Sequence, residues 1–597
     1  MVWWNFFKFL IYSLFLGISS SRDQTRESPA APSKHRPHII FILADDVGWN
    51  DVSFHGSDEI PTPNIDALAY HGVILDRHYV HPICTPSRTA LMTGRYASRS
   101  GMQGFPMSAG ELRAVPLDNA TKLMPEYFRE LGYRTRLLGK WHLGYYQEDL
   151  TPARRGFDSF YGYYNGFINY FDYTYSEPDL LKINVTRYDM HDDDESELRA
   201  AYPRGYFTDM ITEKAEETIK AHALNEPVDR PLFLEIAHLA GHASIKDDPL
   251  EVRDRAQVEA EFGHIENAER RKYAGMIRAM DESVGRVVKA LSEAGMLGNS
   301  IIVFASDNGA PTFGLYANSG SNHPFRGIKG TLWEGGVRGL ACVYSPLIES
   351  RSRVSDELVH EVDWLPSLYA AAGGRMEDLP TSQLDGVDQW PMISRGARSR
   401  RSRALLNIDE VAKTEAAIVG KHKLLKGARN DPTGDFVGAT GNDPAYPAYR
   451  IDEVLESMAG RAIRGLLDDN VRGPSASKIA RLRAKSSRNA RGRCRGSSQQ
   501  RLDCSGVCLF DLERDPCETR DISKQRPRIV RELEAYLDQQ REHLMPQTNT
   551  PSDPCSYDSR ILNGTWQPWI SSEVSMRDYR AGHCQYPAHL LSSSQSQ

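Results

Sequence analysis

The chain of 597 residues lacks several features that would assign it to a common class. Beyond residues 6–18, it contains no apolar run that approaches the roughly 20 residues of a membrane-spanning helix. It shows no internal repeat, and its formal net charge of −7 argues against nucleic acid as its main partner. Because its hydrophobic and charged contents (40% and 25%) are those of soluble globular proteins, we expect a large folded core.

Cysteine is rare over most of the chain, where only Cys84 and Cys342 occur before the last hundred or so residues. Cys342 lies in an apolar stretch and is expected to be a buried thiol. The remaining cysteines are Cys494, Cys504, Cys508, Cys517, Cys555 and Cys584. These cysteines include no Cys-x-x-Cys pair and have no accompanying histidine pattern. Three disulfides are therefore favoured over a zinc site. Their pairing cannot be read from the sequence.

The beginning of the chain has the pattern of a secretory signal. Residues 6–18 are apolar apart from Lys8, Tyr12 and Ser13, and three serines follow, which predicts a signal peptide over residues 1–21. A retained signal anchor is the alternative, and residues 22–36 form a polar lead-in. N-x-[ST] glycosylation sequons occur at Asn119, Asn184 and Asn563. We therefore expect a glycoprotein of the secretory pathway, lysosomal or extracellular, that is soluble after signal cleavage.

Three continuous apolar runs end in polar residues and are expected to be buried parallel strands. They are residues 38–44 before Asp45 and Asp46, residues 300–306 before Asp307 and Asn308, and residues 231–237 before His238 and His242. Amphipathic helical patterns lie between them, most clearly over residues 267–294, which indicates an α/β fold. Ligands of open α/β sheets gather at the carboxyl ends of strands, so we expect these polar groups to share one crevice.

Residues 84–95, CTPSRTALMTGR, combine a cysteine with signals for the start of a helix. Pro86 favours an extended backbone at Thr85, and Ser87 is a candidate N-cap for a helix that follows. A side chain at such a junction faces free amide hydrogens and the positive end of a helix dipole, which suits an anion. Taken alone, Cys84 has an alternative reading as an ordinary buried or disulfide cysteine.

These twelve residues match C-x-P-S-R-x-x-L-x-T-G-R without a gap, and the chain resembles the type I sulfatase family. The resemblance extends to residues 132–144, GYRTRLLGKWHLG, and to residues 326–336, RGIKGTLWEGG. It covers about residues 38–340, with a weaker match at residues 509–516, and is closest to the branch of arylsulfatases B, I and J.

The resemblance implies an α/β fold like that of alkaline phosphatase, in which helices flank a large mixed sheet. It places the catalytic domain at residues 37–400 and a smaller α+β domain at residues 401–597. The latter contains a basic insertion at about residues 453–503 and a cysteine-rich end. We interpret the insertion either as a solvated or disordered segment or as a patch that binds sulfated polysaccharide.

In this family the motif cysteine is oxidised to Cα-formylglycine by the formylglycine-generating enzyme. The resemblance implies a divalent cation held by Asp45, Asp46, Asp307, Asn308 and the modified Cys84. All-oxygen ligation favours Ca²⁺ over zinc. It further implies catalytic or substrate-binding roles for Cys84, Arg88, Lys140, His142, His242 and Lys329. His238 competes with His242, because the proline that follows this histidine in the family is missing here.

The implied activity is hydrolysis of a sulfate ester, in which the hydrated aldehyde attacks sulfur and later expels the sulfate. The substrate is expected to be an N-acetylgalactosamine 4-sulfate of a glycosaminoglycan or an aryl sulfate. The aromatic run at residues 167–175 is either a platform for sugars or packing beneath a loop.

Two alternatives remain at the level of the sequence. One is a hydrolase of phosphate or phosphonate esters with the same fold, which would favour a Ser or Thr nucleophile and additional zinc-binding histidines. The other is a non-catalytic glycoprotein that binds glycosaminoglycans. An aryl sulfate assay with and without a chelator separates the second alternative from an enzyme.

Overall fold

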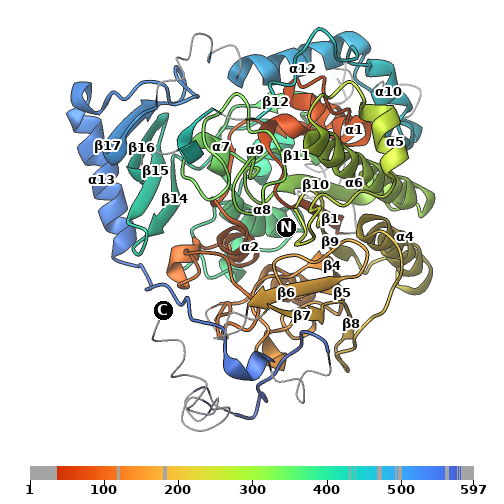
Figure 1. Cartoon of the computed structure of the whole chain (residues 1–597). Helices are drawn as coiled ribbons and strands as arrows, with labels where there is room; N and C mark the ends of the chain where they lie inside the picture. Colours follow the sequence, from red (N-terminus) through yellow and green to blue (C-terminus); the bar gives the residue numbers. More distant parts are fainter. Residues whose placement is uncertain are drawn as a thin grey trace, which may run out of the picture. The chain divides into compact units, whose positions relative to one another are not determined.

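A nine-stranded mixed sheet carries the polar strand ends that the sequence singled out (Figure 1). The computed structural model describes residues 36–116, 121–178, 184–428, 432–436, 438–466, 473–490, 494, 501–557, 564–574, 576 and 579. The predicted signal peptide and the sequons at Asn119 and Asn563 lie outside the described residues.

The strand order of the large sheet is β12-β2-β11-β10-β1-β9-β4-β5-β8. The strands are β1 (His38–Ala44), β2 (Val73–Leu75), β4 (Arg134–Lys140), β5 (Ser159–Tyr163), β8 (His191–Asp194), β9 (Leu232–Ala237), β10 (Ser300–Ser306), β11 (Ala341–Tyr344) and β12 (Arg353–Ser355). β10, β1, β9, β4 and β5 are parallel neighbours, while β11 and β8 run antiparallel to β10 and β5. The expected α/β fold with a mixed sheet is confirmed.

The three predicted apolar strands are adjacent at the centre of this sheet. β1 pairs in parallel with β10 on one side and with β9 on the other. Their residues are apolar on both faces because helices and loops cover both faces of the sheet, and almost all of them are buried. Since all three strands run in one direction, their carboxyl ends meet at one edge of the sheet.

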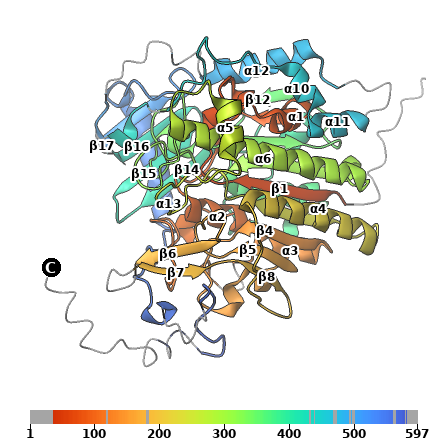
Figure 2. The same ribbon diagram turned by 45° about the vertical axis from the view of Figure 1, so that its right-hand side comes forward.

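Helices surround the large sheet (Figure 2). Their bounds are α1 (Pro63–His71), α2 (Cys84–Thr93), α3 (Met124–Glu130), α4 (Phe207–Asn225), α5 (Arg255–Phe262), α6 (Ala268–Glu293), α7 (Glu334–Val337), α8 (Trp364–Ala371) and α9 (Trp390–Arg395). The predicted helix at residues 267–294 is α6, in which the Asn267 side chain accepts the backbone N–H of Arg270 as an N-cap. Its apolar face packs against α4 and α1.

The helix that carries Cys84 begins earlier than its sequence suggests. α2 starts at Cys84 itself, with Ile83 as an extended N-cap (φ −154°, ψ 156°), so the predictions of an extended Thr85 and an N-cap at Ser87 are wrong. Pro86 fits inside the first turn, because a backbone N–H there would have no intrahelical acceptor. Gly94 ends the helix in the left-handed region, at φ 65°.

A smaller antiparallel sheet of order β14-β15-β16-β17 forms the C-terminal part. It comprises β14 (Arg403–Asp409), β15 (Thr414–Val419), β16 (His422–Ala428) and β17 (Cys504–Asp511), and α13 (Pro527–Arg541) packs on β15 and β16. Two further two-stranded sheets pair β3 (His78–Tyr79) with β13 (Val359–His360) and β6 (Thr174–Pro178) with β7 (Asn184–Tyr188). The smaller α+β part that the resemblance implies at the C-terminal end is confirmed in this antiparallel sheet.

The basic insertion contains folded helices rather than only a solvated segment. Its described part includes α10 (Ile451–Glu456), α11 (Met458–Gly465) and α12 (Ala476–Ala490), and α11 packs against α1 and α6. Ile463, Ile479 and Leu482 are buried. Arg483 donates to the backbone carbonyls of Ser53 and Ser57. The expectation of a solvated or disordered insertion is therefore wrong for these helices, because few but well-spaced apolar residues suffice to dock them.

Disulfides join Cys494 to Cys517 and Cys504 to Cys508. Cys555 is also disulfide-bonded, while Cys584 lies outside the described residues. Cys342, on β11, is a free buried thiol as predicted. Among the described helices, none has both the length and the apolar character needed to cross a membrane.

Candidate active site

An acidic cluster lies where β1 and β10 end. Asp45 and Asp46 follow β1, and Asp307 and Asn308 follow β10, so the parallel pairing of the two strands brings all four together. One carboxylate oxygen from each of the three aspartates lies within 4.8 Å of the others, and the three side chains are buried. The shared crevice that we expected at this sheet edge is present.

Asp46 is held in an unusual backbone conformation, with φ 61°. A non-glycine residue in this left-handed region is uncommon and is maintained only where its surroundings support it. The Nδ2 atom of Asn318 donates to the Asp46 carbonyl at 2.9 Å and to the Gly241 carbonyl at 2.8 Å. Asn318 therefore ties the end of β1 to the loop that carries His242.

Three buried cationic side chains balance the three carboxylates. Nζ of Lys140 lies 2.7 Å from Oδ2 of Asp45, and Nζ of Lys329 lies 2.7 Å from Oδ1 of Asp46. The guanidinium of Arg88 donates to Oδ2 of Asp307 at 2.9 Å. Because charges buried in pairs are tolerated whereas isolated charges are costly, this arrangement stabilises the cluster.

The donor set fits a hard divalent cation. Oδ1 of Asp45 and Oδ1 of Asn308 are buried and accept no hydrogen bond within the described protein. Orphaned buried oxygens are costly unless another partner is provided. Carboxylate and amide oxygens are the ligands that Ca²⁺ and Mg²⁺ prefer, while the imidazoles and thiolates that zinc favours are not part of this cluster.

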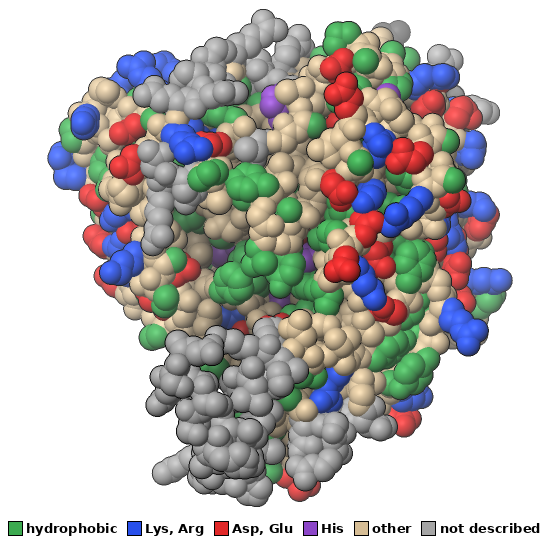
Figure 3. Space-filling model, in the orientation of Figure 1, with side chains coloured by type: hydrophobic (Ala, Val, Ile, Leu, Met, Phe, Trp, Pro, Cys, Tyr) green, Lys and Arg blue, Asp and Glu red, His purple; other side chains and the backbone are tan. Residues whose placement is uncertain are grey.

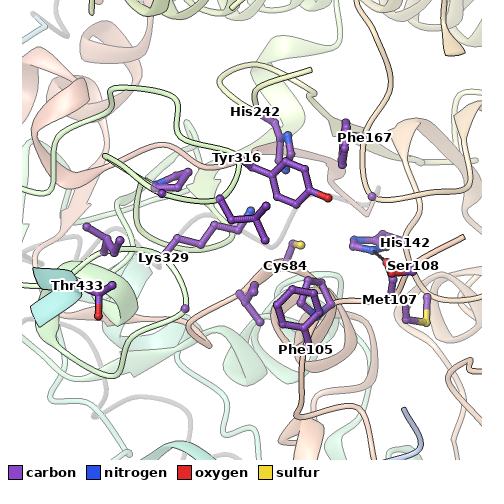
Figure 4. A pocket seen from close by; sticks show the side chains of 18 of the residues that line it. Cys84, Phe105, Met107, Ser108, His142, Phe167, His242, Tyr316, Lys329 and Thr433 are labelled. Atoms are coloured by element: carbon purple, nitrogen blue, oxygen red, sulfur yellow. Dashed lines mark hydrogen bonds between the residues drawn. The ribbon is translucent and has the colours of Figure 1, made fainter. Parts of the chain in front are cut away.

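Cys84 lies at the floor of a pocket of about 250 Å³ (Figure 4). Its side chain points into the space between Lys329 and His142. Burial raises the pKa of the Cys84 thiol, and the charges of Lys140 and Lys329 oppose that rise.

The wall of the pocket is largely apolar. Around Cys84 it is lined by Phe105, Met107, Phe167, Tyr175, Phe313, Leu315, Tyr316 and Ile328. Phe105 and Leu315 are 58% and 65% exposed, which marks an apolar rim. Figure 3 shows hydrophobic side chains gathered beside a hollow near the middle of this face. Lys140 and Arg88 are buried against the carboxylates of Asp45 and Asp307. Neither side chain is among the described residues that line this pocket.

His142 follows β4 and also lines the pocket. Its backbone is left-handed, at φ 59°, and its Nε2 donates to the carbonyl of Met107 at 2.9 Å. Burial, followed by the charge of Lys140, lowers the pKa of His142 well below its ordinary value. The ring is therefore neutral, and its acceptor atom Nδ1 lies 3.5 Å from the hydroxyl of Thr85.

His242, and not His238, faces the pocket. Nε2 of His242 lies 3.5 Å from Oδ2 of Asp46, and its ring stacks on Phe167 with centroids 4.7 Å apart. Burial lowers the pKa of His242 to about 3, against the charge of Asp46. The ring of His238 instead lies 3.3 Å from the hydroxyl of Ser283, on α6.

The aromatic run has two roles. Phe167 and Tyr175 line the pocket, whereas Tyr170 and Tyr173 are buried in the core. Sequence reasoning did not identify Phe105, Tyr316 or Asn318, which lie in loops with no motif of their own. Of the sequons, Asn184 is described, and it is exposed at the start of β7.

Comparisons with known proteins agree with this geometry. The Sulfatase family model matches residues 37–374. Arylsulfatase J of Mus musculus is 36% identical over 564 residues, covering 93% of this chain and 84% of that protein. N-acetylgalactosamine-6-sulfatase of Sus scrofa is 29% identical over 371 residues, covering 61% and 67%. The crystal structure of Ps i-CgsB with k-i-k-neocarrahexaose has a TM-score of 0.64 and 25% identity, covering 87% of this chain and 95% of that one.

Proposed function

The chain belongs to the sulfatase family and is an arylsulfatase-like hydrolase of sulfate esters, and we propose that Cys84, oxidised to Cα-formylglycine, is its catalytic residue. One observation carries the proposal: Cys84 begins a helix at the floor of a pocket, in the electrostatic field of Lys140, Lys329, Asp45 and Asp307. When present, the hydrated aldehyde supplies the attacking hydroxyl. The formylglycine-generating enzyme is the partner that this maturation requires.

We further propose that Asp45, Asp46, Asp307 and Asn308 hold one Ca²⁺ ion. Oδ1 of Asn308 and Oδ1 of Asp45, the latter 3.6 Å from the Arg88 guanidinium, accept no hydrogen bond within the described residues, which supports this assignment. A divalent cation there supplies positive charge that favours a deprotonated hydroxyl. Three carboxylates already face three cationic side chains. An added divalent cation therefore leaves an excess of positive charge, which an anionic ester offsets, so cation and substrate are expected to bind together.

The remaining side chains are proposed to bind the sulfate group or to transfer protons. Lys329, at the pocket wall, and Lys140, beneath it, are proposed to bind sulfate oxygens. The Nδ1–H of His242 donates to the carbonyl of Ala243 at 2.7 Å, so His242 is proposed to protonate the departing alcohol from Nε2, in the charged form that a bound anionic ester favours. Nδ1 of His142 is proposed to take a proton from the oxidised side chain. Arg88 orients Asp307 rather than touching the substrate.

The substrate class is a sulfated carbohydrate or an aryl sulfate. The apolar pocket wall, with Phe167 and Tyr175, offers flat surfaces on which either a sugar ring or an aromatic ring stacks. Two of the comparisons support a sulfated carbohydrate as the substrate. One relative is an N-acetylgalactosamine-6-sulfatase, and one solved neighbour is in complex with k-i-k-neocarrahexaose. The name of the mouse relative supports the aryl sulfate.

We also propose that the protein matures in the secretory pathway and acts in the lysosome or outside the cell. The apolar start of the chain supports this, as do the disulfides near its C-terminus and the exposed sequon at Asn184. The basic insertion remains a proposed contact for sulfated polysaccharide.

The deciding experiment is peptide mass spectrometry across residue 84, after expression in cells that contain the formylglycine-generating enzyme. We expect the mass of the aldehyde, together with aryl sulfatase activity. Full retention of sulfur in an active enzyme would overturn the assignment. Cys84→Ser is expected to accumulate a stable sulfate ester after one turnover, because serine lacks the second hydroxyl that would release it.

A further inference from the structure

The turn that precedes Cys84 is held by a carboxylate outside the sulfatase motifs. Oε1 of Glu361 accepts the backbone N–H of His81 at 2.7 Å and shares a hydrogen bond of 2.5 Å with Nδ1 of the same residue. The His81 and Glu361 side chains are almost completely buried, at 1% and 5% exposure. One oxygen atom therefore fixes both the backbone and the ring of a residue three positions before the nucleophile.

The pairing of two short strands places Glu361 at this turn. β3 and β13 run in parallel, with His78 opposite Val359 and Tyr79 opposite His360. Both strands end in the same direction, so the residues that follow them, His81 and Glu361, come side by side. The segment after β13 is itself fixed, because Asp363 accepts the backbone N–H of His360 and pairs with Arg401.

Two further contacts connect the turn to the rest of the site. The carbonyl of Pro82 accepts the backbone N–H of Gly330 at 2.7 Å, directly after Lys329. The hydroxyl of Ser87, inside α2, donates to the carbonyl of His81 at 3.2 Å. The position of His81 thus sets the start of α2 on one side and its distance from the Lys329 loop on the other.

His81, His360 and Glu361 also have the composition of a metal site, with ligand atoms within 4.8 Å of one another. Several of these donors are already used within the protein. Nδ1 of His81 and Oε1 of Glu361 bind each other, and Nδ1 of His360 accepts the backbone N–H of Val362 at 3.3 Å. We therefore interpret the cluster as a clamp on the turn.

We propose that Glu361 is a positioning residue for the nucleophile: it fixes His81 and thereby the placement of residue 84 between Lys329 and His142. The inference rests on the proposed function, in which residue 84 attacks sulfur. Loss of the carboxylate shifts the attacking group but leaves the sulfate-binding side chains in place. A displacement on the order of 1 Å is enough to lower a rate by about 100-fold.

The test compares Glu361→Ala, Glu361→Asp and Glu361→Gln with the wild type. Three quantities are measured: kcat per aldehyde-containing site, KM, and competitive inhibition by inorganic sulfate. Glu361→Ala and Glu361→Asp are expected to lower kcat by about 10- to 100-fold, because neither side chain reaches both the backbone N–H and the Nδ1 atom of His81. Sulfate inhibition should change less than about threefold, since the anion-binding side chains are untouched. Glu361→Gln keeps an acceptor oxygen and should recover kcat to within about threefold.

Asp281→Ala is the matched control. Asp281 is an equally buried carboxylate that accepts the backbone N–H groups of Asn64 and Ile65 at the start of α1, away from the pocket. The Asp281→Ala variant should have a lower melting temperature than the wild type but the same kcat per aldehyde-containing site. Glu361→Asp keeps the carboxyl group and most of the packing, so it serves as the informative variant if Glu361→Ala does not fold.

Unchanged kcat per aldehyde site in both Glu361→Ala and Glu361→Asp would overturn the inference while the proposed function stands. An equal loss of kcat in Asp281→Ala would show a general structural effect and would also overturn it. A stoichiometric transition metal in the wild type that Glu361→Ala loses would replace the clamp with a metal site. A wild type without the aldehyde would instead refute the proposed function, which the mass of the residue 84 peptide reveals separately.

Discussion

The ammonium group of Lys329 lies 2.7 Å from Oδ1 and 2.8 Å from Oδ2 of Asp46, so one lysine covers both oxygens of a buried aspartate. Burial lowers the pKa of Lys329, but the charge of Asp46 more than compensates and holds that pKa above its ordinary value. Lys329 therefore stays charged at the pocket wall. A cation that is charged before substrate arrives is what recognition of a sulfate monoester requires.

Lys329→Ala and Lys140→Ala are each expected to lower kcat/KM for an aryl sulfate by about 100- to 1000-fold, because each removes a positive charge from the transferring group. Steady-state kinetics with aldehyde content as the measure of active sites checks this. Lys246→Ala is the control, since Lys246 forms an exposed ion pair with Asp172. Wild-type kinetics in both site variants would show that these lysines serve only to balance the acidic cluster.

Removal of divalent cations with a chelator is expected to abolish activity, and Ca²⁺ should restore it better than Zn²⁺, because the proposed ligands are all oxygens. Calorimetric titration of Ca²⁺ into the stripped protein gives a readout that does not depend on turnover. Asn308→Ala should weaken Ca²⁺ binding, since it removes an amide oxygen that accepts no hydrogen bond from the part of the chain that the structure describes. Full activity of a demonstrably metal-free enzyme would contradict the calcium site.

His242→Ala is expected to lower kcat/KM by about 100-fold or more for substrates with a poorly departing alcohol, because the departing oxygen loses the proton that charged His242 supplies from Nε2. The loss should be smaller for nitrophenyl sulfates, whose leaving group needs little assistance. His238→Ala is a matched control, since His238 is equally buried but lies against Ser283. Similar losses in the two variants, independent of the leaving group, would argue that His242 has only a structural role.

Glu235 should make stability depend on pH. Burial raises the pKa of this β9 side chain to about 8, against the charge of Arg88, and its Oε2 has no hydrogen-bond partner within the described residues. The folded state therefore binds a proton more tightly than the unfolded state does. Its contribution to stability is complete below the unfolded pKa, near 4.5, and is lost as the pH rises through about 8.

Glu235→Gln removes this titration. Because Glu235 titrates, the wild type is expected to lose on the order of a few kcal/mol of unfolding free energy between about pH 5 and pH 8. The Glu235→Gln variant should not show this part of the pH dependence. Urea unfolding at several pH values measures both curves. Glu216→Gln, which alters a partly exposed ion pair with Arg286, serves as the control. Parallel curves for wild type and Glu235→Gln would refute the prediction.

Much of the site was predictable because its chemistry is encoded in short contiguous stretches. Apolar runs that end in Asp45, Asp46, Asp307 and Asn308 indicated neighbouring parallel strands, and β1 and β10 confirm that pairing. The family inferred from the motif at residue 84 is likewise confirmed. Local signals were less reliable for helix starts: Ser87 looks like an N-cap, yet α2 begins at Cys84 because tertiary contacts hold the turn before it.

The sequence by itself determined the fold class, the family and the set of reactive residue types, because strand periodicity and catalytic motifs are local properties of the chain. Only the tertiary structure decided which histidine faces the pocket, which lysine meets which aspartate, and that Glu361 holds the turn at His81. Those choices depend on how strands and loops distant in sequence pack together. Distances between such segments follow from the packing of the whole sheet, and no short stretch of residues contains them.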